Sequence, residues 1–134
     1  MTERRPPAAR LVIRRSELAG PVLERVVAAL AARVDLPVDR LSDAQIAAAA
    51  AVAAAGPLLT DGPLCVEIEG APGEITMRLG PLPQGGAARI VEDSAVPGVG
   101  AIVERLVDRW SVDPDGDGER LSLAITAAAG ARPS

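Results

Sequence analysis

The feature that most constrains this chain is an alanine-rich segment near its middle, residues 42–56, with the sequence SDAQIAAAAAVAAAG. Ser42 and Gln45 have the spacing of a capping box, and Gly56-Pro57 supplies a C-terminal stop. The segment therefore predicts a helix over residues 43–55. Alanine has the highest helix propensity and almost no bulk, so this helix can lie close against another backbone. It also offers almost no side-chain chemistry.

The composition excludes several reaction classes. The chain has 134 residues, enough for one domain with its own core, and contains no His, Lys, Asn, Phe or Tyr. Without His there is no Ser-His-Asp or Cys-His nucleophile, no imidazole base and no His-ligated zinc or haem. Cys65 is the only cysteine, which excludes an internal disulfide or thiolate cluster. Its apolar, alternating surroundings favour a packed thiol.

The charge pattern argues against nucleic acid and membrane as partners. The net charge is −4, every basic residue is Arg, and no basic run occurs. No apolar run approaches the ~20 residues that cross a bilayer, and the start of the chain is not followed by a signal-peptide core. We therefore expect a cytoplasmic protein.

Hydrophobic spacing predicts the elements of the N-terminal half. Residues 1–9 read as a flexible arm because of their prolines, and residues 11–13 read as a first strand. A helix follows, with Ser16 as its N-cap and Leu36-Pro37 as its end. Its expected sheet-facing stripe has a spacing of four and comprises Leu18, Val22, Val26, Leu30 and Val34.

After the alanine helix, alternation predicts antiparallel strands over residues 64–69 and 75–79, joined by a turn at residues 71–73. Glu67 and Glu69 would share the solvent face. Residues 80–86 read as a loop, residues 87–92 as a short helix, and residues 99–110 as an amphipathic helix that ends on Trp110, which we expect in the core. A hairpin closes the chain, with the run at residues 110–112 as its first strand, its turn at residues 113–118 and the alternating Leu121, Leu123 and Ile125 in its second strand.

These elements predict a two-layer α+β domain over residues 10–127, with an antiparallel or mixed sheet, helices on one face and a flexible tail over residues 128–134. The acidic turn has Asp113, Asp115 and Asp117 at EF-hand spacing. Ala124 stands where an EF-hand has its bidentate Glu, so we interpret the segment as a hairpin turn without calcium.

The element order and the segment PGVGAIVERLVD, residues 97–108, resemble the small ATP-binding anti-sigma-factor domains of bacteria. These belong to the histidine-kinase-like (Bergerat, or GHKL) ATPase superfamily, in the branch that binds sigma factors and phosphorylates a serine of an antagonist protein. The resemblance covers residues 10–125. It implies a histidine-kinase-like ATPase fold and a protein partner such as a sigma factor or an anti-sigma antagonist.

The residues that carry catalysis in that family are missing here. Its helical Glu-x-x-x-Asn pair, which activates a nucleophile and holds magnesium, matches Ala50 and Ala54. Its adenine-reading Asp-x-Gly-x-Gly motif falls on residues 78–82, which contain no Asp. We therefore expect no catalytic residue, no metal and no kinase or ATPase activity.

The glycines are the only residues that could still contribute to a nucleotide site of this family. A glycine-rich turn before a helix can present amides to phosphate. The candidate cofactor-binding residues are Gly80, Gly85, Gly86, Gly98 and Gly100.

The sequence leaves three functions open. The first is a degenerate regulatory domain that acts by protein–protein binding. The second is an ATP or ADP sensor without hydrolysis, which would bind nucleotide through the glycines. The third is a plain dimerisation domain.

Overall fold

The computed structural model describes residues 7–14, 19–59, 62–93, 95–96 and 100–127. The elements of these ranges are, in chain order, β1 (Ala8–Ile13), α1 (Ala19–Arg33), α2 (Val38–Ala55), the 3-10 turn η1 (Gly56–Leu58), β2 (Leu64–Ala71), β3 (Glu74–Leu82), α3 (Gly86–Asp93), β4 (Ala95–Val96), β5 (Gly100–Ala101), α4 (Ile102–Leu106), β6 (Arg109–Asp115) and β7 (Gly118–Thr126). They form an α+β fold of two layers.

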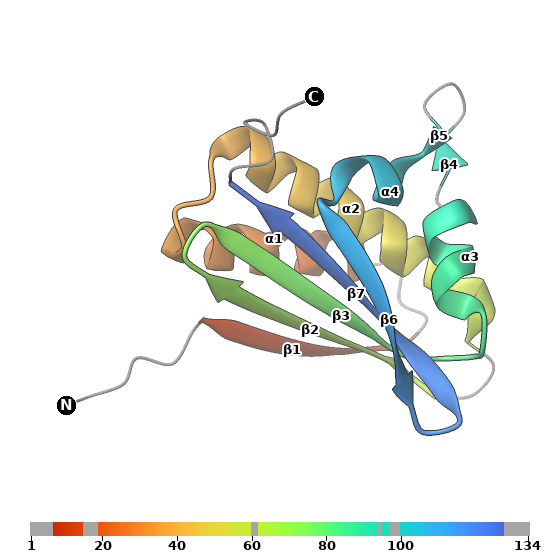
Figure 1. Ribbon diagram of the computed structural model, residues 1–134. Coiled ribbons are helices and arrows are strands. Elements are labelled where there is room, and N and C mark those ends of the chain that lie inside the picture. Colours follow the sequence, from red (N-terminus) through yellow and green to blue (C-terminus); the bar gives the residue numbers. More distant parts are fainter. Residues whose placement is uncertain (1–6, 15–18, 60–61, 94, 97–99, 128–134) are drawn as a thin grey trace.

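The main sheet has five strands in the order β1-β2-β3-β7-β6, and every neighbouring pair is antiparallel. The helices lie together on one face, so the opposite face is open (Figure 1). This arrangement confirms the two-layer α+β prediction and makes the sheet antiparallel. β4 and β5 form a separate two-stranded pair.

The alternation of β2 separates the two faces of the sheet. Leu64, Val66 and Ile68 are buried under the helices, as expected. The residues between them turn to the open face. There Cys65 is only half-buried, and its Sγ accepts a hydrogen bond from Arg10 Nε at 3.1 Å. The expectation of a thiol packed in the core was therefore wrong.

Strand β1 begins at Ala8, two residues before the start that we predicted for the domain. The backbone amide of Gly70 in β2 donates to Pro7 O at 2.8 Å, which ties this segment to the sheet. Residues 1–6 and 128–134, expected to be an arm and a tail, lie outside the described residues.

The buried side of α1 differs from the predicted stripe. Val22 is 47% exposed, whereas Leu23 and Val27 are fully buried and Leu30, Ala31 and Val34 nearly so. The buried arc is shifted because α1 packs against α2 as well as against the sheet. Ser16 and Leu18 lie outside the described residues.

Helix α2 begins at Val38, five residues earlier than predicted, directly after the extended Pro37. Ser42 is therefore an exposed residue inside the helix. The side chain of Gln45 donates from Nε2 to the carbonyl oxygen of Glu24 in α1 at 2.9 Å. The predicted capping box was wrong, although the helix does end before Gly56.

A buried ion-pair network holds the added first turn of α2. Arg40 bonds Asp43 at 2.6 Å and Asp108 at 2.8 Å, and its Nε donates to the carbonyl oxygen of Thr126 at 3.0 Å. Asp108 Oδ2 accepts the amide of Thr126 at 2.7 Å. Arg40 and Asp108 keep 13% and 8% of their side chains exposed. The network joins α2 to the segment before β6 and to the end of β7.

The same contacts set the pKa of Asp108. Burial alone raises the pKa of this carboxyl, but the Thr126 amide and the Arg40 guanidinium favour the charged form more strongly. The net effect is a pKa below the usual Asp value.

The rest of α2 packs through methyl groups. It contacts α1, α3 and α4, and its buried residues are Ala44, Ala47, Ala48, Ala51 and Ala55. The span Val38–Leu58 is also long and apolar enough to cross a bilayer by length and composition, contrary to our expectation. Because five of its alanines are buried in the core and Arg40 is held in ion pairs, we interpret it as a helix that packs within this domain.

The C-terminal half contains the largest difference from prediction. β3 continues through Gly80, Pro81 and Leu82, which we expected in a loop. α3 matches the expected short helix, but α4 is five residues long and Trp110 belongs to β6, where it is 40% exposed. The predicted helix up to Trp110 was wrong because pairing with β7 holds this segment as a strand. Val99 lies outside the described residues.

The closing hairpin forms, but its turn is shorter than the predicted residues 113–118 because β6 continues to Asp115. Asp115 pairs with Gly118 across a two-residue turn, and Gly116 has a φ of +60°. This matches a type II′ turn, which favours glycine in the first central position.

The methyl packing of α2 predicts an asymmetric response to bulk. Ala51 is fully buried, whereas Ala53 is exposed on the same helix. We expect Ala51→Leu to lower the free energy of unfolding by about 1–3 kcal/mol through overpacking, and Ala53→Leu to change it by less than about 0.5 kcal/mol. Urea unfolding followed by circular dichroism measures both, and equal effects would contradict the packing described here.

The lowered pKa of Asp108 predicts a pH-dependent contribution to stability. The ionised carboxylate stabilises the fold fully above the unfolded-state pKa of about 3.9, and this contribution is lost as the pH falls through the lower folded-state pKa. We expect Asp108→Asn to cost about 1–3 kcal/mol at pH 7. The difference from the native chain should shrink below about pH 4. An undiminished difference at pH 2.5 would show that the charge of Asp108 does not stabilise the fold.

Candidate functional site

Three of the predicted glycines lie where β3 turns into α3. Gly80 is buried near the end of β3, and its peptide bond to Pro81 is cis. Gly85 has a φ of +81°, a backbone conformation that residues other than glycine rarely adopt. Gly86 begins α3, and its amide donates to Pro83 O at 2.8 Å. Gly85 and Gly86 therefore lie at the start of α3, whereas Gly80 lies in β3 beside Asp115 and Arg120.

The other two glycines are only partly placed. Gly98 lies outside the described residues, and Gly100 begins β5, which contacts α3. β5 leads into α4, whose five residues are too few for the N-terminal phosphate site of a long helix.

A side chain of the protein itself accepts hydrogen bonds from the backbone amides at the start of α3. Glu119, on β7, accepts the Gly85 amide on Oε1 at 3.1 Å and the Ala87 amide on Oε2 at 2.9 Å. Glu119 is only 8% exposed. Its carboxylate therefore sits where a helix N-terminus would otherwise attract an external anion.

A hollow of about 460 Å³ adjoins the same loop. Its lining includes the apolar Leu58, Pro81 and Pro83 and the acidic Asp115 and Asp117. These carboxylates are an unfavourable lining for a phosphate group because like charges repel.

The wall of α2 toward α4 is built from methyl groups. Ala47, Ala50 and Ala54 follow Asp43 at helical spacings of four, seven and eleven, so they share its side of the helix. Ala50 and Ala54, the positions that the resemblance aligns with a catalytic pair, are half-buried against the core. Neither holds a metal ion nor transfers a proton.

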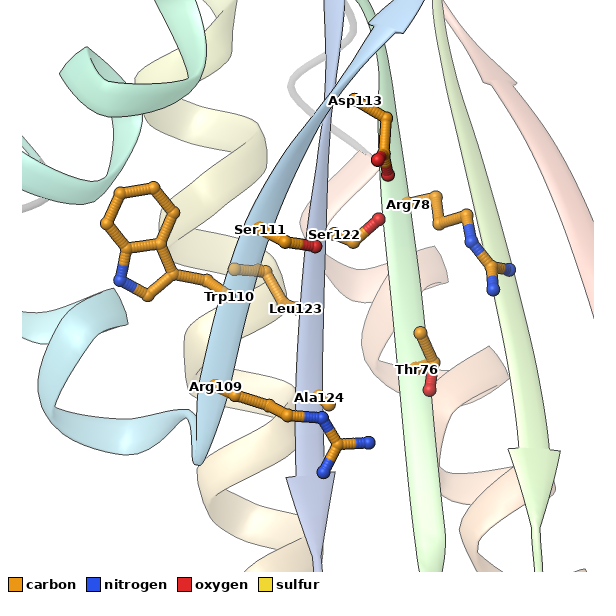
Figure 2. A pocket seen from close by; sticks show the side chains of 9 residues that line it. All are labelled: Thr76, Arg78, Arg109, Trp110, Ser111, Asp113, Ser122, Leu123 and Ala124. Carbon is orange, nitrogen blue, oxygen red and sulfur yellow. The ribbon is translucent and has the colours of Figure 1, made fainter.

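The open face of the sheet contains a polar hollow that sequence reasoning missed. It measures about 310 Å³ and lies over β3, β7 and β6. Figure 2 shows its lining, which includes Arg78 and Arg109, the hydroxyls of Thr76, Ser111 and Ser122, and the carboxylate of Asp113. The sequence signal that could have revealed this hollow is the set of polar residues at the outward-facing positions of each alternating strand.

The arginines of this face are held in ion pairs. Arg78 bonds Glu69 at 3.3 Å, Arg109 bonds Glu74, and Arg120 bonds Glu67 at 3.5 Å. Glu67 and Glu69 lie on the solvent side, as predicted. Partly exposed pairs of this kind add little stability, but they neutralise the guanidinium charges. The face therefore presents hydroxyl groups and charges that are largely paired.

Among the described residues, no group of three acidic or cysteine side chains is placed to hold a metal ion. Comparison of the sequence with models of protein families and with curated proteins found no match.

The contact of Glu119 with α3 predicts a specific loss of stability. Glu119→Ala removes the acceptor of two amides, one of them buried, and we expect it to cost about 1–3 kcal/mol. Glu119→Gln keeps one acceptor oxygen, so it should lower the free energy of unfolding by less than Glu119→Ala. Glu92→Ala, at an exposed position of α3, is the matched control. Chemical denaturation would argue against the contact if Glu119→Ala and Glu92→Ala behaved alike.

Proposed function

We propose that this chain is a catalytically degenerate regulatory domain, related to the anti-sigma ATPase-like proteins, that acts by binding a protein partner in the bacterial cytoplasm. The observation that carries the proposal is the contact of Glu119 with the amides of Gly85 and Ala87. An anion from the chain itself fills the position that a nucleotide phosphate would need.

The chemistry of α2 supports the same proposal. Phosphoryl transfer depends on oxygen ligands that hold magnesium and on groups that position the nucleophile. Ala50 and Ala54 supply neither. The charged side chains near the glycine loop include the carboxylates of Asp115, Asp117 and Glu119. The nearby guanidinium of Arg120 is paired with Asp115 at 3.3 Å. A nucleotide-sensing role would need these carboxylates to move away, so we favour binding by contact over nucleotide sensing.

The partner we propose is a sigma factor or an anti-sigma antagonist. The open sheet face offers paired charges and hydroxyls that suit a polar protein surface. A domain of this kind regulates by occupancy, so its effect depends on stoichiometric binding and not on turnover.

Calorimetric titration tests the proposal. The chain is titrated with purified sigma factors and antagonist domains of the source organism, each with and without Mg·ATP. We expect one of them to bind with a Kd below about 10 µM, at the same Kd in both conditions. The control is a titration with an unrelated domain of similar charge. Binding to none of them, or binding that requires ATP, would contradict the proposal, as would ATP turnover above that of heat-treated protein.

A further inference from the structure

Strand β6 is a free edge of the main sheet. It pairs with β7 on one side only, whereas its other side ends the sheet (Figure 1). Residues 109–114 are all exposed, so neither a helix nor a loop of the described chain covers this edge. A free edge presents unpaired backbone amides and carbonyls, which can pair with another strand.

The register with β7 determines which backbone groups point outward. Asp115 and Gly118 flank a two-residue turn and form a hydrogen-bonded pair, and such pairs alternate along the ladder. Asp113 and Ser111 therefore bond β7, whereas Val112 and Trp110 direct N–H and C=O toward the open edge. Pro114 fits this alternation because its position also points outward and a proline has no N–H to donate.

The side chains of β6 divide into an apolar and a polar side. Trp110 and Val112 lie on the helix side of the sheet yet remain 40% and 41% exposed. Arg109, Ser111 and Asp113 lie on the open face, and Figure 2 shows Trp110 directed away from Ser111 and Asp113. The edge thus combines free backbone groups with two uncovered apolar side chains.

The geometry points to pairing of β6 with β6 of a second copy of this chain, antiparallel, with the two-fold axis at Ser111. In this register Trp110 lies opposite the partner's Val112, and their outward N–H and C=O groups form four hydrogen bonds across the axis. Arg109 lies opposite the partner's Asp113, twice by symmetry. Ser111 faces the partner's Ser111. The result is one continuous sheet of ten strands.

Charge and shape select this occupant and this register. Arg109 keeps 65% of its side chain exposed while it bonds Glu74, so its guanidinium has room for a second carboxylate. A shift of the axis to Val112 would place the ring of Pro114 against the carbonyl of the partner's Trp110. The opposite edge, β1, has Arg10 as its only charged residue and offers no such self-complementary pair. An unrelated extended peptide would match the backbone but not the paired charges.

Trp110 is the only aromatic residue of the chain, so its fluorescence reports directly on this edge. The predicted interface is small, below about 1,000 Å², which implies a weak dimer. We expect sedimentation equilibrium from about 1 µM to about 1 mM to move from the monomer mass of 13.7 kDa toward twice that value. Trp110 emission should shift to shorter wavelength over the same range as water is excluded.

Variants at the axis separate pairing through β6 from any other association. Ser111→Lys places two lysines directly opposite each other, with their Cα atoms about 4.5 Å apart. Because their like charges repel, we expect at least tenfold weaker association, partly restored by salt. Ser111→Thr, the matched control, should dimerise like the native chain. Arg109→Asp or Asp113→Arg alone should also weaken the dimer, and the double variant should recover it because the charges are exchanged.

Three results would overturn the inference. The first is a chain that stays monomeric up to about 1 mM. The second is a dimer that Ser111→Lys leaves unchanged while its thermal melting remains native. The third is a monomer whose Trp110 emission shifts only when a synthetic extended apolar peptide is added, which would assign this edge to a strand of another protein.

Discussion

The helical layer depends on how closely α2 approaches its neighbours, and alanine makes that approach possible. α2 contacts α1, α3 and α4, and all five of its fully buried residues are alanine. Small side chains let helix axes come close while they still exclude water. The same property removes chemistry from this wall, because a methyl group neither binds a metal ion nor moves a proton. The close packing of α2 and the lack of reactive side chains on this wall therefore have one physical cause.

Buried polar groups secure the two ends of this layer. Arg40 fixes the start of α2 through Asp108 and Thr126, and Glu119 fixes the start of α3 through two backbone amides. Among the described residues, every buried side-chain nitrogen or oxygen has a partner. Unsatisfied polar groups are common at reactive sites, whereas a satisfied network stabilises one arrangement. Arg40, Asp108 and Glu119 thus stabilise the fold.

The sequence predicted local features more accurately than long-range ones. The alternation of Leu64, Val66 and Ile68 correctly assigned the two faces of β2 because a period of two depends only on the strand itself. The start of α2 was missed because Arg40, which anchors its first turn, bonds residues 68 and 86 positions away. Trp110 was wrongly assigned to a helix because the apolar residues that precede it repeat at helical spacing, whereas the hydrogen bonds that hold it in β6 form only with β7.

The candidate site was partly readable from the sequence. The glycines at residues 80, 85 and 86 were predicted in one loop, but Gly80 belongs to β3, and the carboxylate that binds the Gly85 amide was overlooked. Glu119 shares the phase of Leu121, Leu123 and Ile125, so the alternation places an acid on the buried face. An inward acid in an otherwise apolar row signals a buried donor, and here the donors are the amides of α3. Its partner was not predictable because residues 85 and 119 meet only in the folded sheet.

The most direct test of the central claim is the response of backbone amides to nucleotide. In ¹⁵N–¹H spectra, Mg·ATP is added to about 5 mM while the resonances of Gly85, Ala87, Ala50 and Ala54 are followed. Because Glu119 already accepts the amides of Gly85 and Ala87, and α2 presents only methyl groups at Ala50 and Ala54, we expect no saturable shift at any of the four. Saturable shifts at these positions would show that a nucleotide binds there, and would contradict the proposal that Glu119 and the methyl groups of α2 leave no nucleotide site.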